Sequence, residues 1–338
     1  MMDSTSVDVL VTGDVYSDLI FSGVKIPRQG TETFAQNFTI SPGGAANRAV
    51  ASARIGADTA LLSAMGDDPI GSIVRQMLST ENNLDMTQTR CLTGVTNPVS
   101  AAITDGSDRS FVTFHTDNPQ PVWNPVRSVR TVMLPAEEEV PDWAHRLHED
   151  GTTLFASVGW DPTGEWSDSL LQRLQSFDVL MLNDAEAKGY SHRDDLNEAL
   201  EIFSEVVPTT VITLGSGGAM AASADGRSAI PGIAVDAKDP TGAGDIFSAA
   251  FMAGTAWNWP IDDCLQLASA CAAYSVTQPG GAVSAPRRDQ LSEFLDAHHC
   301  NDEDWSRLLS WADSRDRPLG SSLDDNSSLD NSSSPNNN

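Results

Sequence analysis

The stretch from Asp239 to Asp245 contains the residue types that hold and act on a phosphate group. Gly242 and Gly244 would let backbone N–H groups approach a ligand closely, and the apolar, alanine-rich run that begins at Ile246 predicts a buried helix. The unpaired N–H groups at the start of a helix form an anion site that suits phosphate. Asp245 adds a carboxylate at the same helix start, within reach of a group held beside that anion. The alternative is a glycine-rich turn in which Asp245 is an ordinary first-turn residue favoured by the helix dipole.

A second glycine pair, Gly43 and Gly44, opens a segment of small residues that we expect to be helical up to Ile55. Two glycines at a helix start again allow the close approach of a ligand. Asn47 stands one turn into this segment, where it and the adjacent Arg48 are the only polar side chains of that turn. Asn47 is therefore a candidate ligand-binding residue, and the alternative is a structural amide that bonds a neighbouring turn.

Short apolar runs alternate with helical segments along the chain, which predicts a mostly parallel sheet covered on both faces. The expected strands are 7–12, 59–64, 131–134, 153–157, 178–182 and 210–214. Polar or glycine residues follow the ends of three of them, where open α/β sheets bind ligands; these residues are Asp18, Asn183 with Glu186, and Gly215 with Gly218. Asp18 alone could equally be a turn former. The loop 213–218 does not match a dinucleotide fingerprint, which would follow the first strand.

Two extended regions, about 19–40 and 95–117, lie outside this alternation. The second contains the dipeptide Asp105-Gly106, which predicts a hairpin turn. These regions predict a small β-sheet appended to the main domain, although edge strands of the main sheet are an alternative. From Pro318 onward the chain is rich in Ser, Asn and Asp. We therefore expect one folded domain over residues 1–317 and a disordered tail over 318–338.

The 338 residues include 47 acidic and 20 basic side chains, which gives a formal net charge of −27. Such a surface repels nucleic acid. Lysine occurs only at positions 25, 188 and 238, and the acids are spread along the chain, as in proteins of salt-accumulating cytoplasms. The alternative is an acidic mesophilic protein. The scattered cysteines, and the lack of a leader or a long apolar run, predict a cytoplasmic protein without a membrane segment.

Together these motifs resemble the two signature patterns of the ribokinase-like (PfkB) family of carbohydrate kinases. The segment 43–49, with Gly56 and Gly66, is similar to the N-terminal pattern, and the segment 239–252 is similar to the C-terminal one. The resemblance covers roughly residues 7–298. It implies a three-layer α/β/α sandwich with a mostly parallel central sheet. It also implies that the extended regions form a β lid over the sugar, which often doubles as a homodimer contact.

The resemblance also implies a role for each matched residue in ATP-dependent phosphorylation of a sugar hydroxyl. Asp245 matches the catalytic base, and Gly242, Ala243 and Gly244 match the anion hole for the transferring phosphoryl group. The positions that match sugar ligands are Asp18, Gly43, Gly44 and Asn47. The positions that match the nucleotide and Mg²⁺ site are Asn183, Glu186 (Mg²⁺ through water), Thr213, Gly215, Gly218 and Ser269.

A monovalent cation such as K⁺ is a further implication of the resemblance. The matching positions are Asp239 and Thr241, with Ser275, Gln278, Gly280 and Ser284. The alternative for Asp239 is a structural carboxylate that caps its own loop.

The acceptor is narrowed by one departure from the family. The segment 160–166 lies where ketodeoxygluconate kinases and fructokinases tend to carry an arginine, and this chain lacks it. A carboxylated or phosphorylated substrate would favour that guanidinium, so the sequence predicts a neutral sugar and leaves a nucleoside open. A silent sugar sensor is a rival from another class, but a binder has no need of the base Asp245.

Overall fold

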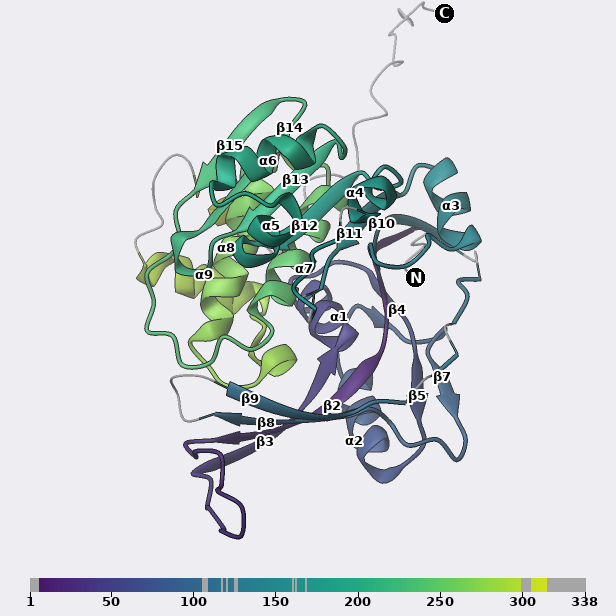
Figure 1. The fold of residues 1–338 in the computed structure, drawn as a ribbon, viewed down its shortest axis with the longest axis vertical. Helices are drawn as coiled ribbons and strands as arrows, with labels where there is room; N and C mark the ends of the chain where they lie inside the picture. The colour runs from purple at the N-terminus through teal and green to yellow at the C-terminus, as the bar shows by residue number, and fades with distance from the viewer. Residues whose placement is uncertain are drawn as a thin grey trace, which may run out of the picture.

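The central sheet has nine strands among the residues that the structure describes (Figure 1). Runs of buried apolar residues form most of these strands. The strand order is β15-β14-β13-β12-β11-β10-β1-β4-β6; β13 to β6 are parallel, whereas β14 and β15 are antiparallel. The bounds are β1 Ser6–Thr12, β4 Thr59–Leu62, β6 Leu84–Asp85, β10 Ser128–Pro135, β11 Thr153–Ser157, β12 Val179–Asn183, β13 Thr209–Thr213, β14 Ala219–Ser223 and β15 Gly226–Ile230. All the strands expected from the apolar runs are present.

The computed structural model describes residues 6–104, 109–116, 118–119, 121–124, 127–159, 161, 163–167, 169–298 and 305–314. The predicted turn at Asp105-Gly106, Trp160 and the predicted tail at 318–338 lie outside these residues. No helix within the described ranges is long and apolar enough to cross a membrane.

Helices cover both faces of the central sheet and create two apolar cores (Figure 1). One core takes its helical residues from α1, α2 and α7 to α10, and the other takes them from α3 to α6. The predicted three-layer sandwich is therefore confirmed. The helices are α1 Ala45–Arg54, α2 Pro69–Ser79, α3 Asp142–Glu149, α4 Ser169–Leu174, α5 Asp184–Ser191, α6 Leu196–Ser204, α7 Ala243–Ala256, α8 Ile261–Val276, α9 Arg288–Ala297 and α10 Ser306–Asp313, with short 3₁₀ turns η1 Gly215–Gly217 and η2 Gly281–Ser284.

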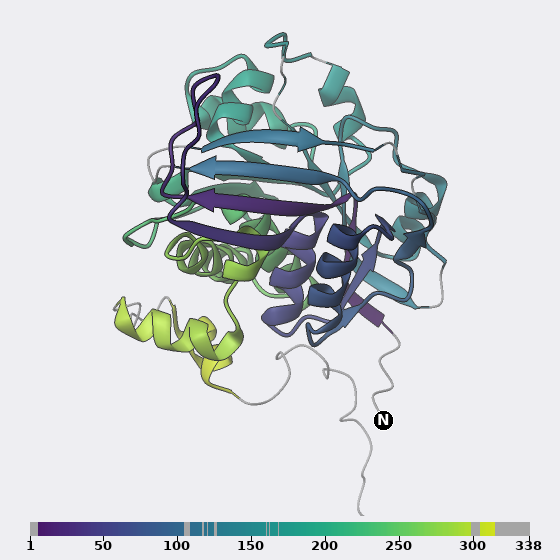
Figure 2. The same cartoon turned by 90° about the horizontal axis from the view of Figure 1, so that it is seen from below.

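The extended regions form a separate four-stranded sheet, and Figure 2 shows this sheet face on. Its order is β3-β2-β8-β9, with β2 Val15–Ser22, β3 Asn37–Gly44, β8 Val99–Thr104 and β9 Arg109–Phe114. The predicted lid is confirmed, and the alternative of edge strands in the main sheet is wrong. A smaller pair, β5 Ala64–Gly66 and β7 Arg90–Leu92, completes the described strands.

Two local expectations are corrected by this lid. Asp18 lies inside β2 and not in a loop, because β2 pairs with β3 and β8 on its two sides. The segment after Ser41 does not start a helix at once, because β3 continues to Gly44 and α1 begins only at Ala45. In both cases pairing between strands that are distant in sequence decides the backbone conformation.

Candidate active site

Asp245 lies in the first turn of α7, a helix that is buried on most of its surface. Gly242 caps this helix in the left-handed conformation, with φ 77°, which glycine adopts without the cost of a Cβ atom. The N–H groups of the first turn have no partner within a helix, and the helix dipole favours a negative charge there. The helix start beside the Asp245 carboxylate is open at Gly244, which has no heavy atom against its Cβ position, whereas the Ala243 N–H donates to the Pro240 carbonyl at 3.3 Å.

The start of α1 meets the start of α7 at this carboxylate. Asn47 Nδ2 donates to Asp245 Oδ2 at 2.9 Å, and Arg48 Nη1 donates to Asp245 Oδ1 at 2.6 Å. The two glycine-rich motifs, far apart in the sequence, therefore converge on one point. Asn47 is 5% exposed, and its Oδ1 has no hydrogen-bond partner. Sequence reasoning missed the role of Arg48, and the only signal was its position directly after Asn47.

Asp18 reaches the same region from the lid. A Cβ atom at Gly43 would collide with the Asp18 carboxylate, and one at Gly44 would collide with the Asp14 carbonyl, so both glycines are required by close packing. Burial raises the pKa of Asp18 to about 6, with a further contribution from the charge of Asp245. Asp18 and Asp245 are therefore near enough to repel each other, and a hydroxyl compound bound between them would separate their charges.

An aromatic pair next to Asp18 was also missed. Tyr16 lies two residues before Asp18 on β2, which places both side chains on the same face of the strand. The Tyr16 Oη atom and His115 Nδ1 are 2.9 Å apart, and the two rings stack with centroids 6.1 Å apart and an interplanar angle of 25°. Burial, then the charges of Asp14 and Asp18, raise the pKa of Tyr16.

Asn183 and Glu186 lie where β12 passes into α5. Asn183 Oδ1 accepts the Glu186 N–H, and Glu186 Oε2 accepts the Asn183 N–H, both at 2.9 Å. This is a capping box, so the pair has a structural role whatever else it binds. The pKa of Glu186 is raised, chiefly by burial and also by the charges of Glu137 and Asp184, despite the hydrogen bonds with Asn183 that act in the other direction. A cation at this point would relieve that repulsion.

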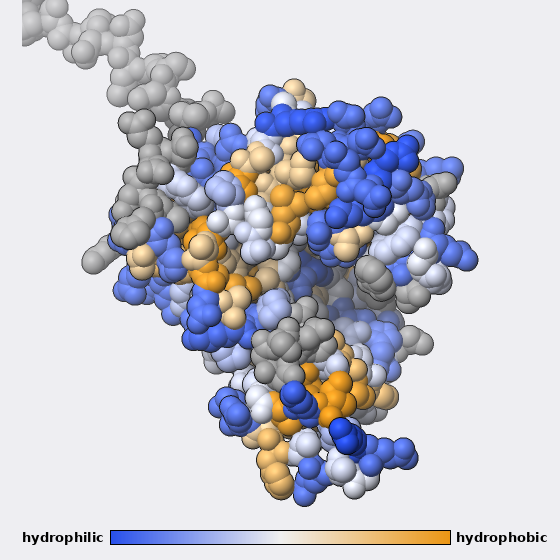
Figure 3. Space-filling view, turned by 60° about the vertical axis from the view of Figure 1, so that its left-hand side comes forward, coloured by the Kyte–Doolittle hydropathy of each residue, from blue (hydrophilic) through white to orange (hydrophobic). Residues whose placement is uncertain are grey.

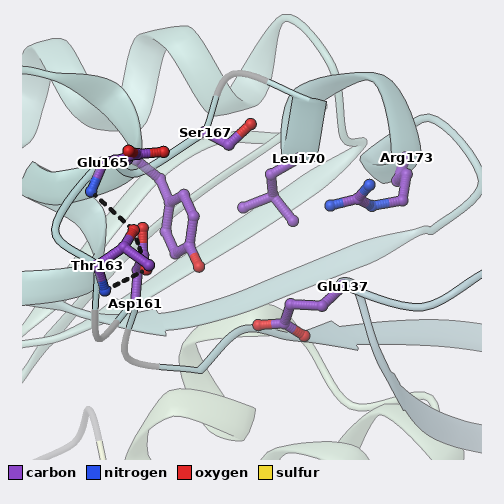
Figure 4. A pocket seen from close by; sticks show the side chains of 8 residues that line it. Glu137, Asp161, Thr163, Glu165, Ser167, Leu170 and Arg173 are labelled. Atoms are coloured by element: carbon purple, nitrogen blue, oxygen red, sulfur yellow. Dashed lines mark hydrogen bonds between the residues drawn. The ribbon is translucent and has the colours of Figure 1, made fainter.

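A cavity of about 310 Å³ has in its wall Glu137, whose charge acts on Glu186 (Figure 4). Asp161, Thr163 and Glu165 lie on one side of it, and Leu170 and Arg173 lie on the other. Glu137 and Tyr190 complete the wall together with Ser167. Glu165 stands two residues after Thr163, so the loop offers a carboxylate at the position where an arginine is typical of the related sugar kinases.

The other positions predicted to bind the nucleotide differ in how much space they leave for a ligand. Thr213 ends β13, and Gly215 opens the turn η1 with φ 56° and with space around it. Gly218 has a structural requirement of its own, because a Cβ atom there would collide with the Ile230 carbonyl. Ser269 lies in α8 and is 7% exposed, which leaves little of its surface for a ligand.

Asp239 is 6% exposed and binds two segments of backbone. Its Oδ1 accepts the Thr241 N–H at 2.9 Å, and its Oδ2 accepts the Gly280 N–H at 3.2 Å. These bonds are the ones expected of a structural carboxylate that caps its loop. No lysine or arginine within the described ranges forms an ion pair with Asp239, and those ranges contain no group of three or more His, Cys, Asp or Glu arranged to hold a metal ion.

Comparison with known proteins fits this geometry. Residues 7–288 match the model of the pfkB family carbohydrate kinases. The chain is 28% identical over 285 residues to the aminoimidazole riboside kinase of Salmonella typhimurium, covering 76% of this chain and 88% of that one. It is 27% identical to the ribokinase of Haemophilus influenzae, over 85% of this chain and 97% of that one. The ribokinase of Arabidopsis thaliana, in complex with ribose and ATP, has the same fold, with a TM-score of 0.72 at 20% identity over 86% of this chain and 99% of that one.

Proposed function

The chain belongs to the pfkB family of carbohydrate kinases, and from this membership we infer that it transfers the γ-phosphoryl group of ATP to a hydroxyl of a sugar or nucleoside. The observation that carries this inference is the convergence of Asn47 and Asp245 at the open start of α7. A carboxylate base and a set of backbone donors at one point are the requirements for phosphoryl transfer to an alcohol.

The proposed roles divide the site into an acceptor side and a phosphoryl side. Asp245 takes the proton of the acceptor hydroxyl. The N–H groups of Gly242, Ala243 and Gly244 receive the oxygens of the transferring phosphoryl group. The acceptor lies between that base and the lid, where its ligands are Asp18, Gly43, Gly44 and Asn47.

The residues that we propose for the nucleotide side include those at the ends of β12 and β13. We propose that Asn183 and Glu186 hold Mg²⁺ through water, because the negative charges of Glu137 and Asp184, which act on Glu186, would attract a hydrated cation to this point. Mg²⁺ would neutralise phosphate charge there. The nucleotide would contact Thr213, Gly215, Gly218 and Ser269.

We propose a neutral sugar as the preferred acceptor, because the segment 160–166 lacks the arginine that related sugar kinases tend to carry there. Arg173 lines the same cavity as Glu165 but lies outside that segment. A nucleoside is the second candidate. The stacked rings of Tyr16 and His115, on the same side of the pocket as Asp18, offer a flat apolar surface to a base. A silent sugar sensor is not favoured, since a binder has no need of the carboxylate that we propose as the base.

A K⁺ ion beside Asp239 and Thr241 is a further proposal. Asp239 is a buried carboxylate whose bonds in the described residues come from backbone N–H groups, and a buried charge of this kind is stabilised by a counter-ion.

We also propose a homodimer formed through the lid. Apolar side chains gather on the lobe at the bottom of Figure 3, which the lid forms. Phe38, Val112 and Phe114 of β3 and β9 share one face of this sheet by strand register and are each at least half exposed, at 55%, 70% and 52%. Sedimentation velocity would check this, and a chain that remains monomeric at high micromolar concentration would contradict it.

The acidic surface and the ATP substrate favour a salt-rich cytoplasm as the working environment. Screening of carboxylate repulsion should then raise the melting temperature as potassium chloride increases towards molar concentrations. A melting temperature that is flat or falls over that range would contradict the proposed salt-rich environment and leave the kinase assignment unaffected.

The function is tested by coupled ADP release with Mg²⁺ and potassium chloride. The acceptors are pentoses, hexoses, ketoses, their phosphates, keto-deoxy acids and nucleosides, and Asp245→Asn serves as the inactive control. Turnover on a sugar or nucleoside is expected. If no acceptor is phosphorylated but a sugar still raises the melting temperature, the chain is a sensor and not a kinase.

A further inference from the structure

Arg48 stands at the reacting end of the site and uses little of its hydrogen-bonding capacity. Its Nη1 donates to Asp245 at 2.6 Å, and the two side chains are 20% and 28% exposed. A guanidinium carries several N–H donors in one plane. Among the described residues, no protein acceptor bonds Nε or Nη2 of Arg48. The side chain therefore keeps N–H donors that a ligand could use.

A second arginine on the same helix shows what a structural role requires. Arg54 donates from Nε and Nη2 to Glu81, and from Nη1 to the carbonyls of Val283 and Ala285. Each of its nitrogens has a protein acceptor, and its side chain is 13% exposed. Arg48 has no such set of partners, and its ion pair with Asp245 uses only one of its three nitrogens.

The geometry of phosphoryl transfer brings the reacting group to Arg48. The acceptor hydroxyl must lie about 3 Å from its base, and about 3–3.5 Å from the phosphorus that it attacks. Arg48 already touches that base, so the oxygens on the phosphorus come within reach of its remaining N–H groups. We propose, on the basis of the kinase function above, that Arg48 is a catalytic residue that donates hydrogen bonds to the phosphoryl group in transfer.

In the proposed phosphoryl transfer, the bond that forms is matched by one that breaks. The acceptor oxygen forms a bond to the γ-phosphorus while the bond from that phosphorus to the β,γ-bridging oxygen breaks. The bridging oxygen leaves on ADP with the electron pair, and the proton of the acceptor passes to Asp245. Negative charge spreads over the oxygens of the phosphoryl group during this exchange, and a guanidinium beside them stabilises it.

An anionic acceptor is a less suitable ligand for Arg48. The acceptor side of the pocket already holds Asp14, Asp18 and Asp245, and the charge of Asp245 contributes to the raised pKa of Asp18. A second anion on that side would add to this repulsion. ATP delivers its γ-phosphoryl group to Asp245 whatever the acceptor is, so a phosphoryl oxygen is the anion that Arg48 is certain to meet.

The first test compares Arg48→Gln with Arg90→Gln. Arg90 lies exposed on β7, and its side chain has no hydrogen bond or ion pair with the described residues, so it controls for the loss of one positive charge. We expect Arg48→Gln to lower kcat by about 10²–10³-fold, with the KM values of ATP and acceptor changed less than about threefold. A raised acceptor KM at unchanged kcat would make Arg48 an acceptor ligand and overturn the proposal.

The second test separates contact with the phosphoryl group from an effect through Asp245. In an Asp245→Asn background, a residue that only positions Asp245 has nothing left to position, so Arg48→Gln would then change nothing further and the proposal would fail. A residue that contacts the phosphoryl group should still lower the remaining kcat by about tenfold or more. The affinity for ADP with aluminium fluoride and acceptor should fall by the same order in Arg48→Gln, while the affinity for ADP with acceptor stays the same.

Failure of the kinase function can be distinguished from failure of the Arg48 inference alone. Arg48→Lys keeps the charge but not the planar fork; it takes the place of Arg48→Gln if that variant does not fold, and it should retain more activity than Arg48→Gln if both fold. A wild-type chain that phosphorylates no acceptor overturns the kinase function together with this inference. An active wild type whose Arg48 variants match Arg90→Gln overturns the inference alone.

Discussion

The two parts of the molecule that meet at the site contribute to it in opposite ways. The sandwich supplies Asn47, Arg48 and Asp245 from helices α1 and α7, which are buried along most of their length. The lid supplies Asp18 and Tyr16 from β2, in a sheet whose outer residues include several exposed aromatic rings. The proposed base and the side chains that bond it stand on buried helices, whereas Asp18 and Tyr16 stand on the more exposed sheet.

This difference assigns different kinetic roles to the two parts. A change at Asp245 or Arg48 of the sandwich should act on kcat, because we propose that these groups act during the reaction. A change in the lid should act on the binding of the acceptor, because it alters groups that the acceptor meets before the reaction. A lid variant with a pure kcat effect, or a sandwich variant with a pure KM effect, would break the comparison.

The largest effect is expected from Asp245→Asn. The amide keeps the size of the side chain and can still bond Asn47, but it cannot accept the proton of the acceptor. We expect kcat to fall by about 10²–10⁴-fold, the usual contribution of a positioned general base, while both substrates bind with nearly the same affinity. Steady-state kinetics and calorimetric titration measure the two quantities. More than a tenth of the wild-type activity would show that Asp245 is not the base.

The next effect concerns the stability of the sandwich. Arg54 joins α1 to Glu81 and to the backbone at Val283 and Ala285, and the Glu81 side chain is 9% exposed. Arg54→Met would leave these acceptors without a donor, although Glu81 keeps Arg287 at 3.0 Å. We expect the free energy of unfolding to fall by about 3 kcal/mol.

Urea denaturation measures that loss, with Arg90→Met as the control for charge. Well below the melting temperature, kcat should change less than about threefold, because Arg54 bonds no group at the acceptor pocket. An equal loss of stability in both variants would mean that overall charge is responsible and that the buried contacts are not.

Much of this arrangement could be predicted from the sequence. The small residues before Ala45 and Ile246 predicted two candidate ligand-binding segments that end at Asn47 and Asp245, and the structure brings these two residues together. The alternation of apolar runs and helices indicated the sandwich, because that period depends only on neighbouring residues. Both predictions rest on short-range information.

The remaining features depend on contacts that local sequence does not contain. Asp18 was expected in a loop, because its place in β2 is decided by pairing with β3 and β8, which are distant in the chain. Arg48 was noticed as a polar residue only, because the reach of a long side chain toward another helix has no periodic signal. The stacking of Tyr16 on His115 joins residues that are 99 positions apart.

A third prediction uses the raised pKa of Asp18, about 6. The ionised carboxylate accepts hydrogen bonds from acceptor hydroxyls, so affinity for the acceptor should fall by up to about tenfold per pH unit below pH 6. The contribution of Asp18 to the free energy of unfolding changes with pH in the opposite direction. The pKa in the folded state lies above its ordinary value of 3.8, so ionisation of Asp18 costs the folded state, and this contribution to the free energy of unfolding decreases as the pH rises from about 4 to 6.

Calorimetric titration of the acceptor against pH measures the midpoint. In Asp245→Asn, which removes the neighbouring charge, the midpoint should move to lower pH, and in Asp18→Asn the acid limb should be absent. An unchanged acid limb in Asp18→Asn would assign it to another group.

The smallest effect is expected from the cation proposed beside Asp239. Through its bonds to Thr241 and Gly280, Asp239 holds the loop that leads into α7, and a K⁺ ion there would fix the direction of the N–H groups at Gly242 and Gly244. Replacement of potassium by tetramethylammonium at constant ionic strength should lower kcat a few-fold, well below the roughly 10²-fold that loss of one oxyanion donor costs. The acceptor KM and the melting temperature should stay similar, as the comparison of sandwich and lid requires, and Asp239→Ala should abolish the difference between the two salts. Equal rates in both salts would leave Asp239 with the structural role that its two backbone bonds already describe.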